Sequence, residues 1–386
     1  MIHGFEKKEF ERRIERATEI ISNNELDALF LTTPANFFYF SGFSTQFWQS
    51  PTRPWFLIVA RSGVITAVIP AIGKPAMDLL PIVNSIYTWD SPKPEDEGIS
   101  LLTKIFNSMP KKFGRIGVEM GIESTLRMPL VDFMSLKNNL SGYEFVNGSD
   151  QIWKIRMTKT EEEVKRIKHI CNIVSDAFET LPKIIELGKS ERQIYQEFKI
   201  DILQRGADTV PYMPVISGQG GYNQIIVGSS DKKLNNGDVL VIDTGSTFDG
   251  YFSDFDRNFG VGNVSDKALR ANEIVWDATE IGISTAKPGT SVEKVWFEMN
   301  KFLEAKGNLG GAVGRMGHGL GLQLTEPPSN KNGDKTILQP GFILTIEPSM
   351  EYERGKIIVH EENLVIRDDG AELLSRRAPR EMIRIK

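Results

Sequence analysis

Residues 237–262, GDVLVIDTGSTFDGYFSDFDRNFGVG, decide the fold of the C-terminal part of this chain. Their continuous apolar run at 239–242 predicts a buried strand, and this strand ends on a carboxylate, Asp243. Asp249 followed by Gly250 is a pair that favours a two-residue hairpin turn. A second strand is therefore expected over residues 251–259.

The acidic residues of this expected hairpin fall on one side of it. Side chains alternate between the two faces of a strand, so the aromatic positions of the second strand share one face and Asp254, Asp256 and Asn258 share the other. Asp243 and Asp254 then lie on neighbouring strands and can point into one space. Both stay ionised there only if a cation lies between them. Taken alone, the segment leaves two interpretations open, a metal site or a solvated polar face.

The pattern occurs a second time. Residues 234–243 are LNNGDVLVID and residues 338–347 are LQPGFILTIE, and both fit L-x-x-G-x-(V/I)-L-x-I-(D/E). In each copy a further strand with a second acid follows, Asp254 in the first and Glu361 in the second. Solvated acids have no reason to recur in register at strand ends, so the repeat favours the metal interpretation.

The segments upstream of the two hairpins also match. Residues 188–206 and 289–307 are helical segments bounded by glycines, and the pairs Ser190/Gln193 and Thr290/Glu293 predict capping boxes at their starts. The C-terminal part is therefore predicted to be an internal duplication, helices followed by a hairpin, twice. A pseudo-twofold axis between the copies would bring four carboxylates to one centre.

Composition limits the classes of protein that remain. A chain of 386 residues with 40% hydrophobic residues predicts two domains, placed at 1–152 and 153–386. The net charge of −5 and the lack of a Lys/Arg cluster argue against a nucleic-acid partner. No apolar run reaches membrane-spanning length and the charged N-terminus has no signal core, so a cytoplasmic protein is expected. The single cysteine, Cys171, is expected to be a buried thiol.

The N-terminal part alternates helix and strand signals and is expected to be an α/β domain. A helix is predicted at 10–21, and strands at 28–32, 55–60, 63–69 and 115–118. Residues 36–55 carry eight aromatic residues in twenty. Two interpretations stay open for this segment: core packing beneath a loop, or the lining of a substrate pocket with Arg53 as an anion-binding residue.

His318 is the histidine whose surroundings suggest a ligand. Glycines flank it on both sides, which lets the backbone approach whatever the imidazole binds. It also lies between the two acidic hairpins in a chain with four histidines. We therefore predict that it binds metal.

These residues carry a family resemblance. Asp243, Asp254, His318, Glu347 and Glu361, with their flanking DTG, SDFDRNF, GHGLGL, EPP, TIEP and HEE motifs, resemble the pita-bread metallopeptidases, which include aminopeptidase P, prolidase and creatinase. The resemblance covers about residues 150–386. The segment ALFLTTPANFFYFSGF resembles the creatinase-type N-terminal domain of the same proteins. It implies an α+β fold, a pita-bread domain with an internal pseudo-twofold duplication preceded by a smaller α/β domain.

The resemblance also implies the cofactor. Two divalent transition-metal ions, Mn, Fe, Co or Zn, would share Asp254 and Glu361 as bridging ligands, with Asp243, His318 and Glu347 as terminal ligands. Such a pair generates hydroxide at neutral pH and polarises the scissile group. The implied activity is hydrolysis of a C–N, amide-type bond in a small polar or dipeptide-like substrate. Relatives of this branch also imply a homodimer, with Arg53 or Trp55 reaching the other subunit's pocket.

The sequence departs from these peptidases at three positions. Thr325 and Ile226 stand where the peptidases carry histidines, and Val359 stands where aminopeptidase P and prolidase carry an arginine. Loss of one oxyanion donor costs about 100- to 1000-fold in rate, so we expect Xaa-Pro dipeptides to be cleaved at least about 100-fold more slowly than by a true prolidase. The candidate replacement groups are Thr325, Glu326 and His360, the last turned away from Glu361 by strand alternation.

Two alternatives to a hydrolase remain on the sequence alone. One is a metal-dependent lyase of a small zwitterion, resembling the dimethylsulfoniopropionate lyases. Its cation would need an aromatic wall, which the side chains of Phe47, Trp48, Trp55 and Tyr222 could supply. The other is a binding module without catalysis, which the retention of all five ligand residues disfavours.

Overall fold

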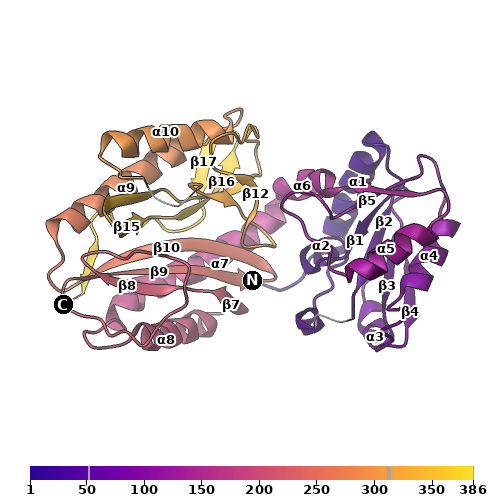
Figure 1. Ribbon diagram of the computed structural model, residues 1–386, viewed down its shortest axis with the longest axis horizontal. Helices are drawn as coiled ribbons and strands as arrows, with labels where there is room; N and C mark the ends of the chain where they lie inside the picture. Colours follow the sequence, from indigo (N-terminus) through magenta and orange to yellow (C-terminus); the bar gives the residue numbers. More distant parts are fainter. Residues whose placement is uncertain (51–52, 311–313, 386) are drawn as a thin grey trace. The chain divides into compact units, whose positions relative to one another are not determined.

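The computed structural model describes residues 1–50, 53–310 and 314–385 (Figure 1). The chain forms two compact units, one of Gly4–Arg156 and one of Met157–Lys386 together with Met1–His3. The boundary predicted between residues 152 and 153 falls inside helix α6 (Ser149–Met157), and it stays a prediction.

The N-terminal unit is built on a mixed sheet of six strands in the order β4-β3-β2-β1-β5-β6. The strands are β1 (Ala28–Leu31), β2 (Phe56–Ala60), β3 (Ile65–Pro70), β4 (Ser85–Trp89), β5 (Arg115–Val118) and β6 (Glu144–Asn147). β1–β2 and β2–β3 pair antiparallel, and the other neighbours pair parallel. Every residue of the central strand β1 is buried, which explains its continuous apolar sequence.

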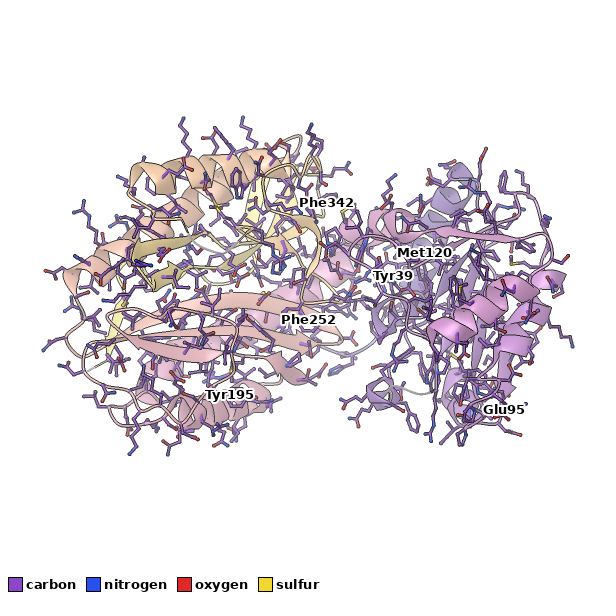
Figure 2. All side chains as sticks on the ribbon, in the orientation of Figure 1. Tyr39, Glu95, Met120, Tyr195, Phe252 and Phe342 are labelled. Carbon is purple, nitrogen blue, oxygen red and sulfur yellow. The ribbon has the colours of Figure 1, made fainter. Side chains whose placement is uncertain are left out.

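Helices of this unit cover the sheet. They are α1 (Lys7–Asn23), α2 (Pro34–Ser41), α3 (Lys74–Met77), α4 (Ile99–Ser108) and α5 (Leu130–Asn139). Phe106 of α4 and Phe145 of β6 both pack on Phe30 in an aromatic core. Between α1 and α2, the buried Arg13 guanidinium lies 4.5 Å over the ring of Tyr39. Figure 2 labels Tyr39 in this unit. The predicted α/β alternation is therefore present.

The C-terminal unit contains the predicted first hairpin, β9 (Asp238–Phe248) and β10 (Tyr251–Val261). Asp249 and Gly250 join the strands with φ of 50° and 79°, the positive pair that a type I′ turn requires. β10 also pairs with β18 (Ile383–Ile385), and β9 pairs with both β7 (Thr209–Tyr212) and β8 (Val215–Gln219). The aromatic face of β10 packs on helix α7 (Glu161–Thr180), where the rings of Phe178 and Phe255 are 5.6 Å apart.

The second hairpin contributes to another five-stranded sheet, in the order β12-β11-β13-β16-β17. Its strands are β11 (His318–Gly319), β12 (Glu326–Ser329), β13 (Ile343–Ile346), β16 (Glu362–Arg367) and β17 (Gly370–Leu373), with a separate hairpin of β14 (Ser349–Glu353) and β15 (Lys356–Val359). Helices α9 (Asp266–Thr285) and α10 (Val292–Ala305) cover this sheet, while α7 and α8 (Glu191–Gln204) cover the first (Figure 1). Val275, Met299 and Leu344 belong to the core between α9, α10 and the second sheet.

Matched hydrogen bonds in the two halves support the duplication. In the first half the amide of Gly188 donates to the carbonyl of Leu234, and in the second the amide of Gly289 donates to the carbonyl of Leu338. The glycines that precede the two strands, Gly237 and Gly341, both have positive φ, 92° and 86°.

The helix starts agree with the sequence in one of the two predicted cases. A capping box forms at Ser190, as predicted, and another forms at Thr160. The cap of α10 was predicted at Thr290, but Ser291 occupies that position and accepts a hydrogen bond from the amide of Lys294. Adjacent Thr and Ser residues satisfy the same sequence pattern, so the pattern alone does not choose between them. Across the described residues, no helix combines the length and apolar character needed to cross a lipid bilayer.

Candidate metal centre and substrate cavity

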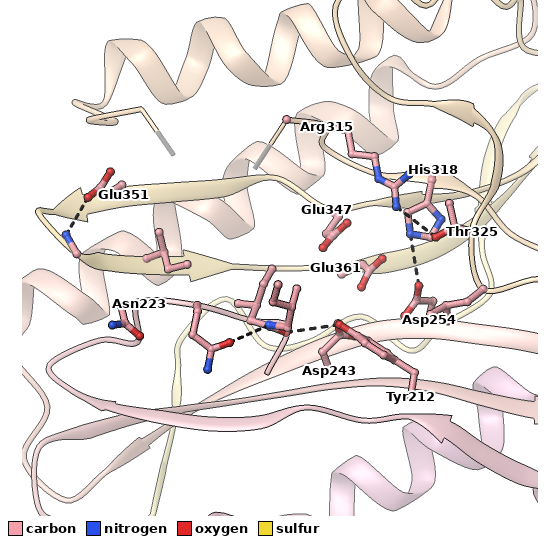
Figure 3. Close-up of a pocket in the computed structure, with 17 residues that line it drawn as sticks. Tyr212, Asn223, Asp243, Asp254, Arg315, His318, Thr325, Glu347, Glu351 and Glu361 are labelled. Atoms are coloured by element: carbon pink, nitrogen blue, oxygen red, sulfur yellow. Dashed lines mark hydrogen bonds and ion pairs between the residues drawn. The ribbon is translucent and has the colours of Figure 1, made fainter. Parts of the chain in front are cut away.

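The five predicted metal ligands all line one cavity of about 660 Å³ in the C-terminal unit (Figure 3). Asp243 and Asp254 come from the first hairpin, and the three other ligand residues, His318, Glu347 and Glu361, come from the second half. Each half therefore supplies part of the ligand set, as the duplication predicted. All five side chains lie at strand ends or within strands, which fixes their positions.

Three of these residues meet the geometric requirement for a metal site. One ligand atom each from Asp254, His318 and Glu361 lies within 4.8 Å of the other two. The three residues are at most 4% exposed. Asp254 Oδ1 and Glu361 Oε1 are buried and lack a hydrogen-bond partner in the described part of the chain, as does Asp243 Oδ1. Buried carboxylate oxygens without donors are costly, and a divalent cation would satisfy them.

The electrostatics of the centre favour a bound cation. Burial raises the pKa of Asp254 to about 8 and that of Glu347 to about 7. Burial, followed by repulsion from Asp254 and Glu347, raises the pKa of Asp243 and of Glu361 well above the ordinary range. Burial lowers the pKa of His318, so its imidazole is neutral and able to donate a lone pair to metal. An oxygen-rich set with one imidazole fits a divalent transition metal.

Hydrogen bonds from the second sheet hold Asp254 in place. The side chain of Asn363 accepts from the amide of Asp254 at 2.9 Å and donates to its carbonyl. The buried thiol of Cys171 donates to the same Asn363 oxygen at 3.3 Å, and burial raises the pKa of that thiol. Cys171 is thus a structural residue, as predicted. Asn363 joins the two halves of the unit at the metal centre.

His318 is oriented by its own backbone surroundings. Its Nδ1 is 2.9 Å from the carbonyl of Gly319, so Nδ1 carries the proton and Nε2, 3.4 Å from Asp254 Oδ2, faces the carboxylates. The preceding Gly317 has φ of 124°, and a Cβ there would lie 2.1 Å from the carbonyl oxygen of Thr345. The flanking glycine therefore allows the close backbone approach that the sequence suggested.

Asp256 is a fifth acid beside the centre. It lies directly opposite Asp243 in the ladder of the first hairpin, so the two side chains share one face. It is 1% exposed, and its Oδ1 has no hydrogen-bond partner in the described part of the chain. Burial, followed by repulsion from Asp243, raises its pKa well above the ordinary range. Asp256 is not among the described residues that line the cavity.

The rest of the cavity wall is apolar with a few polar groups. Its apolar side chains come from Ile225, Ile226, Leu324 and Ile357. Thr325 also lines the cavity, and its Oγ1 accepts a hydrogen bond from Arg315 Nη2 at 3.2 Å (Figure 3). The hydroxyl of Tyr212 donates to the carbonyl of Ile225 at 3.5 Å. Burial, followed by the nearby acids, raises the pKa of Tyr212, which keeps this phenol protonated.

Three candidate site residues are not among the described residues that line the cavity. The carboxylate of Glu326 is buried and forms an ion pair with Lys159 at 3.0 Å. The ring of His360 faces Arg377, 3.3 Å from its Nη1, as strand alternation predicted. Tyr222 is 1% exposed, and its hydroxyl donates to Asn258 and accepts from the amide of Val359. The catalytic roles of Glu326 and His360 and the substrate contact of Tyr222 stay predictions, and these surroundings are those of structural groups.

The other predicted substrate-binding residues belong to the N-terminal unit. Trp55 is buried and stacks on Phe43 with ring centres 5.1 Å apart. The guanidinium of Arg127 lies 4.9 Å over the ring of Trp48, and that of Arg53 lies 5.5 Å over Phe47. Part of the aromatic segment is thus core packing, which was one of the two interpretations. The substrate contacts of Trp48, Trp55 and Arg53 stay predictions.

Sequence reasoning missed several polar groups of the cavity, among them Arg315 and Tyr212. Tyr212 lies at the end of β7, and Arg315 lies in the glycine-rich loop before β11. Neither belongs to the repeated pattern that identified the ligands. Arg315 stands three residues before His318, and that proximity was the only signal in the sequence.

Comparison with known proteins identifies the family. The model of metallopeptidase family M24 matches residues 165–368, and the model of the creatinase/prolidase N-terminal domain matches residues 13–158. This chain belongs to metallopeptidase family M24. The predicted fold class, a pita-bread domain preceded by a creatinase-type α/β domain, is confirmed.

Individual relatives agree with this assignment. The Xaa-Pro dipeptidase of Pyrococcus furiosus is 27% identical over 94% of this chain and 97% of that protein. The crystal structure of prolidase from Thermococcus sibiricus superposes with a TM-score of 0.86, at 26% identity over 99% of this chain and 100% of that one. A dipeptidase of Mycobacterium ulcerans has the same fold, with a TM-score of 0.85 at 24% identity over 99% of both chains.

The comparisons also decide among the three activities considered from the sequence. The chain is a metal-dependent hydrolase of the Xaa-Pro peptidase and creatinase group, as predicted. They support the hydrolase over a lyase or a binding module without catalysis. Membership of the family implies divalent metal as the cofactor.

Proposed function

We propose that this protein is a dipeptidase that hydrolyses Xaa-Pro dipeptides with two divalent metal ions. The observation that carries the proposal is the convergence of Asp243, Asp254, His318, Glu347 and Glu361 on one cavity, in a chain of this family. Relatives that span nearly the whole chain are named Xaa-Pro dipeptidases. A dipeptide is also small enough for a cavity of about 660 Å³.

The ligand residues have distinct proposed roles. Asp254 and Glu361 would bridge the two ions, because their facing carboxylates come from opposite halves of the unit. Asp243, His318 and Glu347 would be terminal ligands. When bound, the ions supply activated water at neutral pH and polarise the scissile carbonyl. Which of Mn, Fe, Co or Zn serves is left to the metal dependence of activity.

The remaining cavity residues orient the substrate. The phenol of Tyr212 lies on the cavity wall with Asp243 and counters part of the rise in the pKa of that carboxyl. The apolar side chains of Ile226, Leu324 and Ile357 form a wall that suits a proline ring and excludes water from the reacting bond. Ile226 is 76% exposed, so this wall reaches the mouth of the cavity.

The test is hydrolysis of a dipeptide panel by metal-loaded protein. Proline release from Xaa-Pro dipeptides is compared with cleavage of the matching Xaa-Gly dipeptides, after loading with Mn²⁺, Co²⁺, Fe²⁺ or Zn²⁺. Asp254→Ala should lose metal, measured by elemental analysis, together with activity, while its circular dichroism spectrum stays native. Loaded wild-type protein that releases no proline with any of the four metals would overturn the proposal.

Further parts of the proposal concern assembly and location. We place the protein in the cytoplasm as a homodimer without a nucleic-acid or membrane partner, on the composition and the branch of the family. The aromatic segment 36–55, with Arg53 and Trp55, is the proposed contribution to the partner subunit. Light scattering at micromolar concentration tests this, and a monomer there would contradict it.

A further inference from the structure

Arg315 is the one Lys or Arg among the described residues that line the cavity. It is half-buried, and its Nη2 donates to Thr325 Oγ1 at 3.2 Å. In the described part of the chain it forms no ion pair within 4.0 Å, although it lies among the acids of the centre. Its side chain lines the same cavity as the carboxylates of Asp254 and Glu347.

A cation in this place is unfavourable for metal binding alone. It repels divalent ions, and no carboxylate of the described chain pairs with it. The ligand carboxylates face the place of the ions and none of them pairs with Arg315 within 4.0 Å, so its charge is left for another anionic partner. That charge is explained if the substrate brings a negative group of its own.

We propose that Arg315 binds the C-terminal carboxylate of the dipeptide substrate and thereby selects dipeptides over longer or amidated peptides. This inference rests on the proposed function. A guanidinium presents N–H groups in a planar fork that matches a carboxylate, and the bond to Thr325 uses only one of its nitrogens. Thr325 is the positioning residue that aims this fork.

The location agrees with the length of a dipeptide. The carboxylate carbon lies three bonds from the scissile carbonyl carbon, so the two are within about 4 Å of each other. A carboxylate-binding group must then lie beside the metal ligands. Arg315 fulfils this condition, because it lines the same cavity as Asp254 and Glu347 and precedes His318 by three residues (Figure 3).

The test compares two substrates that share the scissile bond and differ in one charge. For an Xaa-Pro dipeptide and its C-terminal amide, kcat and KM are measured with wild-type protein, Arg315→Ala, Arg315→Lys and Thr325→Val. Arg192→Ala is the matched control, because it removes a surface guanidinium, 53% exposed, of the same unit. Metal content and melting temperature are measured for each variant.

The expected result is a selective loss. Arg315→Ala should lower kcat/KM for the free acid by about 10- to 100-fold, mainly through KM, and change that for the amide by less than about 3-fold. Arg315→Lys should restore part of the loss, Thr325→Val should show a smaller loss of the same kind, and Arg192→Ala should show none. Equal losses on both substrates, or loss of metal from Arg315→Ala, would overturn the assignment.

A binding measurement separates this inference from the proposed function. Proline and prolinamide are titrated calorimetrically into metal-loaded wild type and Arg315→Ala. If the wild type hydrolyses no Xaa-Pro dipeptide but binds proline better than prolinamide, and Arg315→Ala loses that preference, the role of Arg315 stands while the proposed activity fails. Binding that ignores the carboxylate would refute the role itself.

Discussion

Removing metal with a chelator should make the stability of the C-terminal unit fall as the pH rises from 6.5 to 8. Burial raises the pKa of Asp254 to about 8 and of Glu347 to about 7, whereas in the unfolded chain such groups titrate near pH 4. The folded state therefore binds more protons than the unfolded state between these values. The stability that this difference provides is complete below about pH 4 and is lost progressively up to the folded-state pKa.

The histidines define the lower limit of the useful range. Burial lowers the pKa of His318, and still more that of His360. Below about pH 6.5 these histidines are protonated in the unfolded state but not in the folded state, which lowers stability as the pH falls. Their effect is therefore opposite in sign to that of the buried acids. Above that pH the acids act alone. A carboxyl group that is protonated in the folded state and ionised in the unfolded state changes the free energy of unfolding by about 1.4 kcal/mol per pH unit. Asp254 alone therefore accounts for about 2 kcal/mol between pH 6.5 and 8. Asp243 and Glu361, whose pKa is raised further, act in the same direction.

Scanning calorimetry at constant ionic strength measures the effect. For a domain of this size, about 2 kcal/mol corresponds to a fall of about 4–8 °C in the unfolding midpoint. Bound Mn²⁺ pairs with the carboxylates at every pH in the range, so the loaded protein should show a nearly flat midpoint. Asp254→Asn is the control variant, and its slope without metal should be smaller. A chelated wild-type protein whose midpoint stays level or rises from pH 6.5 to 8 would refute the reasoning.

Three further predictions concern single side chains. Asp256→Asn should raise the unfolding midpoint of chelated protein more at pH 8 than at pH 5, measured by calorimetry. The raised pKa of this buried acid facing Asp243 makes the wild type lose stability as the pH rises, whereas an amide does not titrate; an equal change at both pH values would contradict this. Lys159→Met should lower the free energy of unfolding, measured in urea, by about 3–5 kcal/mol, because it removes the buried cation that pairs with Glu326. Lys159→Arg is the milder control, and a loss below about 1 kcal/mol in Lys159→Met would count against the prediction. Thr325→His should raise kcat on Xaa-Pro dipeptides by about 10-fold or more, since an imidazole there adds an oxyanion donor; an unchanged or lower kcat would show that the missing donor is not limiting.

The acids that meet at the candidate metal centre could be predicted from sequence because they belong to a periodic pattern. Strand alternation places Asp243 and Asp254 on one face of a hairpin, and the repeat at 338–347 places Glu347 in the equivalent position. Both features depend on local spacing alone. The structure keeps that spacing, including the positive φ of the glycines before each strand.

The same rule, applied consistently, would have set Glu326 aside. Strand alternation turns His360 away from Glu361, and it also sends the neighbouring side chains of Thr325 and Glu326 to opposite sides, although both are predicted as catalytic groups. In the structure Thr325 lines the cavity and Glu326 pairs with the buried Lys159. The partner that explains Glu326 lies far away in the sequence, at the start of the unit, and no local pattern connects the two.

Arg315 and Tyr222 show two limits of sequence reasoning: the first lines the cavity without having been predicted, and the second is predicted there but does not line it within the described residues. Arg315 reaches the cavity from a loop, and the path of a loop depends on contacts that periodicity does not encode. The sequence predicts Tyr222 as part of an aromatic wall. In the structure its hydroxyl donates a hydrogen bond to Asn258 and accepts one from the amide of Val359 inside the core. A buried tyrosine with both hydrogen-bonding roles satisfied serves packing as well as any surface role.

The distribution of ligands between the two halves has a consequence for how the unit responds to metal. Asp243 and Asp254 belong to one hairpin, and His318, Glu347 and Glu361 to the other half, so an ion bound by both sets cross-links the two sheets. Within the described chain, Asn363 already joins them through the backbone of Asp254, and Arg257 joins them through the Glu361 carbonyl and the Glu362 carboxylate. These hydrogen bonds and ion pairs hold the sheets together against the mutual repulsion of the buried acids. A bound cation would attract the acids of both sheets and so replace the repulsion with attraction. Metal binding and the mutual docking of the duplicated halves should therefore be coupled, and substitution of a ligand acid should weaken the docking in the metal-loaded protein while relieving repulsion in the chelated one.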